Sequence, residues 1–142
     1  MNFSCVGRRE NGEMYMKFNK PFTPVERIQL LQRSILVNSF AYYMLDDNIL
    51  TDFQYDANAR QLAEMKKSYP DEFERSRYYE YFKDFCSEDD DTHYTSGFDL
   101  LHRVEKKDRD LYRRLHIDAL WALENKRKLG TGRFNEPWRY GE

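Results

Sequence analysis

The amino-acid sequence predicts a mainly α fold: an antiparallel helical hairpin extended by two or three further helices, with a short N-terminal β-hairpin. Three observations predict this class. Capping patterns that start helices occur at Thr23 and at Thr51. Apolar residues recur at helical spacing through most of the chain. An Asn-Gly pair near the N-terminus, flanked by alternating apolar residues, is the strongest short-range hairpin signal.

The segment Phe3–Phe18 is predicted to form the β-hairpin, because apolar residues alternate on both sides of Asn11-Gly12. A first helix should follow, with Thr23 as its N-cap, Pro24 in its first position and Glu26 completing a capping box. Its apolar face is broad, which predicts a helix buried on two sides. That face holds Ile28, Leu31, Ile35, Leu36, Phe40, Tyr42, Tyr43 and Leu45.

The segment Asp46–Asn48 is expected to end this helix, and a second helix is predicted over about Thr51–Tyr69, stopped by Pro70. The short loop between the two implies that they are antiparallel. A third helix is predicted over Asp71–Cys86. The four consecutive acids Glu88–Asp91 then indicate a solvated loop.

The segment Phe98–Lys128 predicts one long helix or two shorter ones. The stretch Glu105–Asp110 is so polar that it should be exposed, or the helix should break there. Gly130-Thr-Gly132 is expected to end the helix. The aromatic tail beyond it either packs on the body or docks on a protein partner. Its aromatic anchors are Phe134, Trp138 and Tyr140.

The length of 142 residues predicts a single domain, residues 1–142. Its parts are the β-hairpin and connector (1–22), the helical hairpin (23–70), additional helices (71–128) and the aromatic tail (129–142). The formal net charge of −2 gives no global reason to expect nucleic-acid binding. The N-terminus lacks the apolar core of a signal peptide, and no apolar run is long enough to span a membrane. We therefore expect a cytoplasmic protein with its two cysteines reduced.

Five residues around the turn between the first two helices are candidates for one polar, aromatic-walled site. Asp52, Tyr55 and Asp56 share one face of the first turn of the second helix, because they stand at i, i+3 and i+4. Tyr42 and Tyr43 close the preceding helix. Tyrosine rings can stack on a flat cationic ring, and carboxylates can accept hydrogen bonds from its amide or sugar hydroxyls.

The pattern Y-Y-x-x-D-x5-D-x-x-Y-D, ahead of a helix ending near Tyr69-Pro70, resembles the N-terminal helical domain of bacterial NAD-dependent DNA ligases. The resemblance covers about residues 27–70. It implies binding of NAD or its nicotinamide mononucleotide half. Tyr42 and Tyr55 would then flank the nicotinamide, Tyr43 would occupy a position that is His or Tyr in the family, and Asp52 and Asp56 would contact the amide, ribose or phosphate side.

The departures from the ligase pattern are as informative as the match. No K-x-D-G adenylation motif occurs, and two cysteines cannot form a four-cysteine zinc site. The chain is therefore not expected to be a ligase by itself, nor to require a cofactor. We expect a non-catalytic NAD- or nicotinamide-mononucleotide-binding module. By analogy alone, such a module would suit a phage or mobile-element protein in the host cytoplasm. That protein would sequester or sense nucleotides, or modulate host ligase or defence.

Other interpretations of the same residues stay open. The five site residues could simply cap and pack the helical hairpin, leaving a protein-interaction or inhibitor module that contacts its partner through the tail and the Glu88–Asp91 loop. An enzyme using Asp52 or Asp56 as a base ranks last, since no activated nucleophile or phosphate loop is visible. The histidines show no metal-binding spacing. The basic residues around 106–114 alternate with acids, which favours ordinary ion pairing over nucleic-acid binding.

Overall fold

The computed structural model describes residues 22–86 and 95–134, and these ranges are helical and irregular, with no strand among them. The predicted mainly α class is confirmed. The β-hairpin predicted at 3–18, the Glu88–Asp91 loop and the tail residues Trp138 and Tyr140 lie outside the described residues. Six helices follow one another: α1 (Pro24–Met44), α2 (Asp52–Ser68), α3 (Pro70–Glu74), α4 (Tyr79–Phe82), α5 (Gly97–Lys107) and α6 (Arg109–Phe134).

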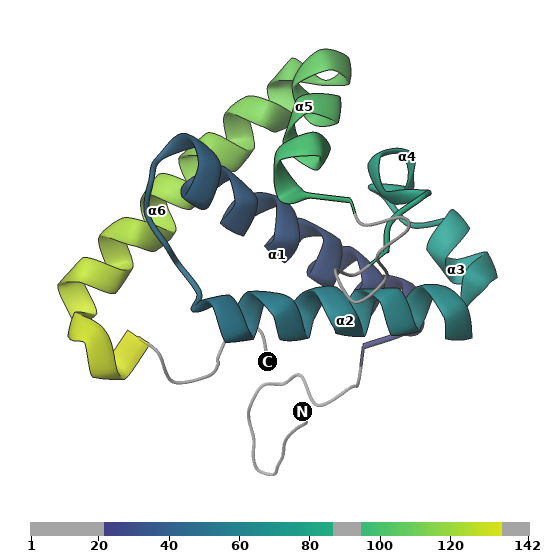
Figure 1. The fold of residues 1–142 in the computed structure, drawn as a ribbon, viewed down its shortest axis with the longest axis horizontal. Helices are drawn as coiled ribbons and strands as arrows, with labels where there is room; N and C mark the ends of the chain where they lie inside the picture. The colour runs from purple at the N-terminus through teal and green to yellow at the C-terminus, as the bar shows by residue number, and fades with distance from the viewer. Residues whose placement is uncertain (1–21, 87–94, 135–142) are drawn as a thin grey trace, which may run out of the picture.

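Helix α1 lies at the centre and contacts α2, α3, α5 and α6 (Figure 1). Its start follows from local sequence, because the Thr23 hydroxyl accepts from the Glu26 amide and the Glu26 carboxylate accepts from the Thr23 amide. Its end is a tight turn in which the Asp47 amide donates to the Ala41 carbonyl at 3.1 Å and Asp46 adopts a φ of 55°. The chain then returns along α1 as α2, as the short loop predicts.

The hydrophobic core forms around α1, because this helix lies at the centre of the fold. Buried residues of α1 face more than one neighbour, so this helix is buried on two sides as expected. Tyr42 and Tyr43 are exceptions, because both side chains are exposed at the end of α1. The largest fully buried side chains come from α1, α2, α3, α4, α5 and α6 alike, namely Ile28, Ile35, Leu36, Leu62, Phe73, Phe82, Leu100, Leu101, Val104 and Leu115.

The single helix predicted over Asp71–Cys86 is wrong, since two short helices with a turn between them occupy this range. Polar side chains form hydrogen bonds with the backbone groups of the turn. The Ser76 hydroxyl donates to the Phe73 carbonyl at 2.5 Å, and Gln29 of α1 accepts from the Arg77 amide at 3.0 Å. Gln32 of α1 donates to the same Ser76 hydroxyl at 2.9 Å. These tertiary contacts outweigh local helix propensity.

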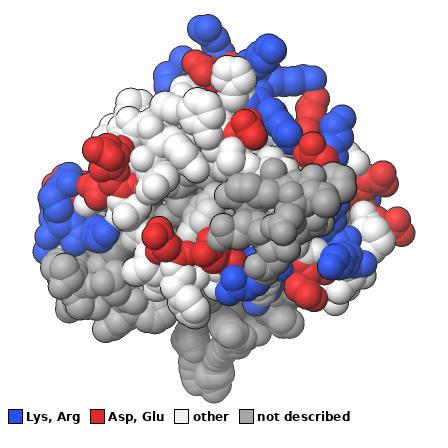
Figure 2. All heavy atoms as spheres, in the orientation of Figure 1, with Lys and Arg blue, Asp and Glu red and all other residues white. Residues whose placement is uncertain are grey.

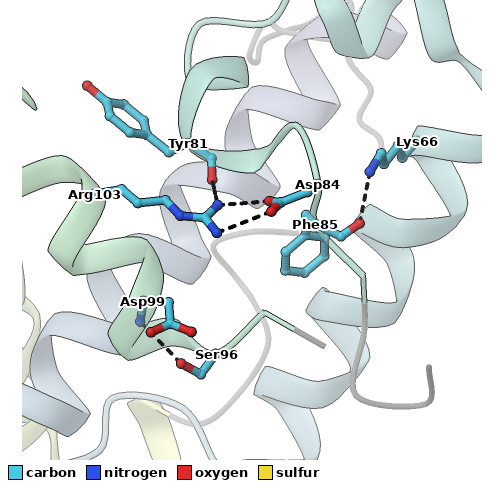
Figure 3. Close-up of polar contacts among 7 residues, drawn as sticks. All are labelled: Lys66, Tyr81, Asp84, Phe85, Ser96, Asp99 and Arg103. Carbon is cyan, nitrogen blue, oxygen red and sulfur yellow. Dashed lines mark hydrogen bonds and ion pairs between the residues drawn. The ribbon is translucent and has the colours of Figure 1, made fainter. Parts of the chain in front are cut away.

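Charged side chains of neighbouring helices donate hydrogen bonds to α4 and to the residues that follow it (Figure 3). Arg103 of α5 donates to the Tyr81 carbonyl at 2.8 Å and to both carboxylate oxygens of Asp84 at 2.8 and 3.3 Å. Lys66 of α2 donates to the Phe85 carbonyl at 3.1 Å, and its ammonium lies 5.7 Å from the centre of the Phe73 ring. A four-residue helix has little stability of its own, so these contacts hold it in place.

The segment predicted as one or two helices forms two, with the break inside the polar stretch. Helix α5 ends at Lys107 and α6 begins at Arg109, and the Asp108 carboxylate between them accepts from the Leu111 amide at 3.0 Å. The expected end at Gly130-Thr-Gly132 is wrong, because α6 continues to Phe134. Glycine costs about 1 kcal/mol against alanine inside a helix, which is too little to stop it. No helix among the described residues is long and apolar enough to cross a membrane.

Candidate functional site

The start of α2 places three of the five predicted site residues. The Thr51 hydroxyl accepts from the Gln54 amide at 3.1 Å, and the Gln54 side chain accepts from the Thr51 amide at 3.0 Å. This capping box fixes Asp52 as the first residue of α2. Asp52 is exposed, and Asp56, one turn later on the same face, is half-buried.

Tyr42 and Tyr43 form an exposed aromatic pair at the end of α1. Their rings meet edge to face with centroids 4.8 Å apart, and the two residues are 54% and 42% exposed. Large aromatic side chains on a helix next to a core are normally buried. Figure 2 shows a broad uncharged area over the end of α1 in this orientation. The pair therefore leaves an accessible aromatic surface at the end of α1.

Tyr55 is held between α1 and α5. Its hydroxyl lies 3.0 Å from the Oγ of Ser39, a buried residue of α1. Gly97, the first residue of α5, packs against both groups, because a Cβ at this position would lie 2.3 Å from the Ser39 Oγ and 3.0 Å from the Tyr55 hydroxyl. Only glycine allows α5 to approach this closely.

The start of α5 also touches the tyrosine pair. The Phe98 ring lies 5.7 Å from the Tyr43 ring in an edge-on contact and stacks on His102 at 6.5 Å. Gly97 thus contacts Tyr55, and Phe98 contacts Tyr43. These two consecutive residues at the start of α5 therefore connect the α1 part of the predicted site with its α2 part. Sequence reasoning missed Ser39, Gly97 and Phe98. A Ser-Gly-Phe start of a helix carries no signal for a contact that spans more than 40 residues of chain.

The electrostatics of this face are acidic. Burial raises the pKa of the Tyr43 hydroxyl, and nearby Tyr42 and Asp99 raise it further. No hydrogen bond or ion pair joins the Asp52 or Asp56 carboxylate to any residue in the described ranges. Two carboxylates without partners among the described residues suit a cationic or hydrogen-bond-donating ligand.

The structure thus brings Tyr42 and Tyr43 into ring contact and places Tyr55 beside α5. Asp52 and Asp56 share the face of α2 that carries Tyr55. Helix α6 borders the same turn, because Lys126 donates to the Asn48 carbonyl at 2.5 Å.

The remaining candidate groups have ordinary surroundings. His116 stacks on Phe40 with ring centroids 5.0 Å apart, and His102 stacks on Phe98. Among the residues described, no group of three or more His, Cys, Asp or Glu side chains could hold a metal ion. Cys86 is half-buried beyond the end of α4 rather than on a helix face.

Comparison with known proteins finds a similarity for one segment of the chain. Residues 22–76 match the family described as DNA ligase-like, N-terminal NAD+-binding domain. The DNA ligases of Roseiflexus castenholzii and Thermoanaerobacter sp. (strain X514) are 35% and 38% identical over 48 residues, which is 34% of this chain and 7% of each ligase. The DNA ligase of Thermotoga petrophila is 33% identical over 51 residues, 36% of this chain and 7% of the ligase. No solved structure matches the chain.

The match ends within the turn after α3, so α4, α5 and α6 lie beyond it. All five predicted site residues lie inside the match, whereas Gly97 and Phe98 lie outside it. This chain therefore combines a segment, residues 22–76, that is similar to the N-terminal NAD+-binding domain of DNA ligase with helices that the match does not include.

Proposed function

We propose that this chain is a non-catalytic binding module for NAD or nicotinamide mononucleotide. The observation that carries the proposal is the exposed Tyr42–Tyr43 pair at the end of α1, within the segment similar to the ligase NAD+-binding domain. The same segment carries Asp52 and Asp56, whose carboxylates have no partner among the described residues. The oxidised nicotinamide ring is flat and cationic, and it carries an amide. Aromatic faces and carboxylates are the groups that recognise such a ring.

Each residue has a proposed role. The exposed ring of Tyr42 stacks on the nicotinamide, with Tyr43 supporting it edge-on. Tyr55 contributes the part of its ring that is not buried, at a position set by its hydroxyl contact with Ser39. Asp52 and Asp56 accept hydrogen bonds from the amide or the ribose hydroxyls.

The proposal is a binding function because the chain contains no K-x-D-G motif that would supply a nucleophilic lysine. A module that binds the nucleotide without consuming it suits sensing or sequestering NAD-type nucleotides. By analogy, we also propose that the chain is a phage or mobile-element protein that acts on a ligase or a defence system of its bacterial host.

Calorimetric titration with NAD and with nicotinamide mononucleotide tests the proposal. We expect micromolar binding by the wild-type protein and a loss on the order of 10- to 100-fold for Asp56→Asn, because the hydrogen-bond acceptor loses its negative charge and one of its two accepting oxygens. Glu64→Gln is the matched control, since Glu64 is an exposed acid on the same helix, and it should bind like wild type. Absence of heat up to millimolar ligand would refute the proposal.

A second candidate function, a protein-interaction module, is favoured by one face of α6. Ile117, Leu120 and Trp121 stand at i, i+3 and i+4, and all three are exposed, Trp121 to 66%. A thermal-shift assay separates the two functions. Nicotinamide mononucleotide should raise the melting temperature of a nucleotide-binding module and should leave that of a pure interaction module unchanged.

A further inference from the structure

Two adjoining cavities lie on another part of the molecule, between the α3–α4 region and the corner where α5 meets α6. Their volumes are about 290 Å³ and 380 Å³, and both are lined by Tyr81. Because Tyr81 is common to both, we refer to the two cavities together as the Tyr81 groove. The first cavity is completed by Glu80, Lys83, Arg103, Lys106 and Lys107, and the second by Arg33, Arg77, Tyr78, Asp108, Leu111 and Arg114.

Basic side chains dominate both cavities. The first has four cationic residues against one carboxylate, and the second has three against one. Figure 2 shows Lys and Arg atoms gathered at the end of the molecule where α5 ends and α6 begins. The chain as a whole carries a formal charge of −2, so this concentration is local.

Three of the cations have protein partners. Lys107 pairs with Glu80 at 2.5 Å, Arg103 pairs with Asp84, and Arg33 pairs with Asp118. Arg103 also donates to the Tyr81 carbonyl, while the Tyr81 ring points away from that contact (Figure 3). These pairs build the walls of the groove and leave their charges largely compensated.

Four cations in the groove are not compensated in this way. The side chains of Lys83, Lys106, Arg77 and Arg114 make no ion pair or hydrogen bond with any residue of the described ranges. They come from the α3–α4 turn, the end of α4, α5 and α6. The expected pairing of basic residues with neighbouring acids therefore holds for only part of this cluster.

We propose that the Tyr81 groove binds the phosphate backbone of nucleic acid. Guanidinium and ammonium groups are the usual partners of backbone phosphates, and arginine can bind a phosphate with two parallel hydrogen bonds. The uncompensated cations are spread along two cavities and several elements rather than converging on one point. That distribution fits a chain of successive phosphates better than one small anion. Contacts of this kind position a nucleic acid without reading its sequence.

Fluorescence anisotropy of a labelled 20-base-pair DNA duplex, titrated with the full chain at several salt concentrations, tests this inference. The test variant combines Arg77→Gln, Lys106→Gln and Arg114→Gln. The matched control removes the same charge elsewhere, through Arg27→Gln, Arg60→Gln and Lys67→Gln, all exposed cations on α1 and α2. Circular dichroism melting verifies that both variants fold.

We expect the wild-type affinity to fall steeply with salt. The groove variant should bind at least 10-fold more weakly at low salt, and its log–log salt slope should be smaller by about 2 to 3, because each phosphate contact contributes about 0.9. The control variant should stay within about 3-fold of wild type, whereas equal losses in both variants would overturn the assignment to the groove. Displacement of the duplex by inorganic pyrophosphate, at constant ionic strength and equal phosphate concentration, would show a small-anion site and would also overturn the inference.

Discussion

The Oγ of Ser39 and the hydroxyl of Tyr55 lie 3.0 Å apart and join the two helices of the ligase-like segment beneath its candidate nucleotide face. Ser39 is 1% exposed, so its hydroxyl cannot exchange this partner for water. Helix α5 begins directly against the pair through Gly97. This contact fixes the position of the Tyr55 ring.

Tyr55→Phe should lower the free energy of unfolding by about 1 kcal/mol, because the Ser39 hydroxyl loses its partner while the ring is kept. Urea denaturation measures the change. Nicotinamide mononucleotide binding should weaken less than in Asp56→Asn, since the ring remains. An unchanged unfolding free energy would mean that the hydroxyl contact contributes nothing.

Gly97→Ala should destabilise the protein by about 1 to 3 kcal/mol, because the new Cβ would lie 2.3 Å from the Ser39 Oγ. Intrinsic helix propensity alone predicts the opposite sign. Combining Gly97→Ala with Ser39→Ala should recover part of the loss, since the closest atom is removed. Equilibrium unfolding of the two single variants and the double variant measures this coupling.

Ser76→Ala should cost about 1 to 3 kcal/mol. Gln32 is fully buried, its amide nitrogen donates to the Ser76 hydroxyl, and its side-chain oxygen has no hydrogen-bond partner within residues 22–86 and 95–134. Adding Gln32→Met to Ser76→Ala should restore most of the stability, because the stranded polar group is then replaced by an apolar one of similar size. Chemical denaturation of the two variants tests this, and a double variant no more stable than Ser76→Ala would contradict it.

The Arg103–Asp84 pair should make stability depend on acid pH. The hydrogen bonds from Arg103 lower the pKa of Asp84 in the folded protein. The stabilisation is therefore complete above the unfolded carboxyl pKa of about 3.9 and disappears as the pH falls through the lower folded pKa. Both side chains are more than a third exposed, so the effect should be about 0.2 to 1 kcal/mol. The difference in melting temperature between wild type and Arg103→Gln should therefore be larger at pH 6 than at pH 2, where the hydrogen bond from Arg103 to the Tyr81 carbonyl still remains in wild type.

Asp46→Gly should raise the free energy of unfolding by about 0.5 to 1 kcal/mol. Asp46 has a φ of 55° in the turn that ends α1, and glycine adopts this conformation without a steric cost. Urea denaturation provides the measurement. Asp47→Gly is a suitable control, because Asp47 has no positive φ, and this change should not stabilise the protein.

The accuracy of sequence-based prediction in this chain depends on how local each signal is. The helix starts after Thr23 and Thr51 were predictable because each capping box lies within four consecutive residues. The interruption at Ser76 was not, because it involves Gln29 and Gln32 from another helix. At the candidate site, the shared face of Asp52 and its neighbours follows from helical spacing. The contact of α5 with that face joins residues far apart in the chain, and no local pattern encodes it.

Helix α1 belongs to the segment that is similar to the ligase domain, but its packing extends beyond that segment. Residues such as Leu36 and Phe40 belong to the ligase-like segment, yet α1 also packs on α5 and α6, which the match does not include. Cut out alone, residues 22–76 would expose these apolar side chains to water. We therefore expect the cooperative unit to include at least Leu123, which is a buried core residue of α6. Anyone transplanting this module into another protein should move the later helices with it.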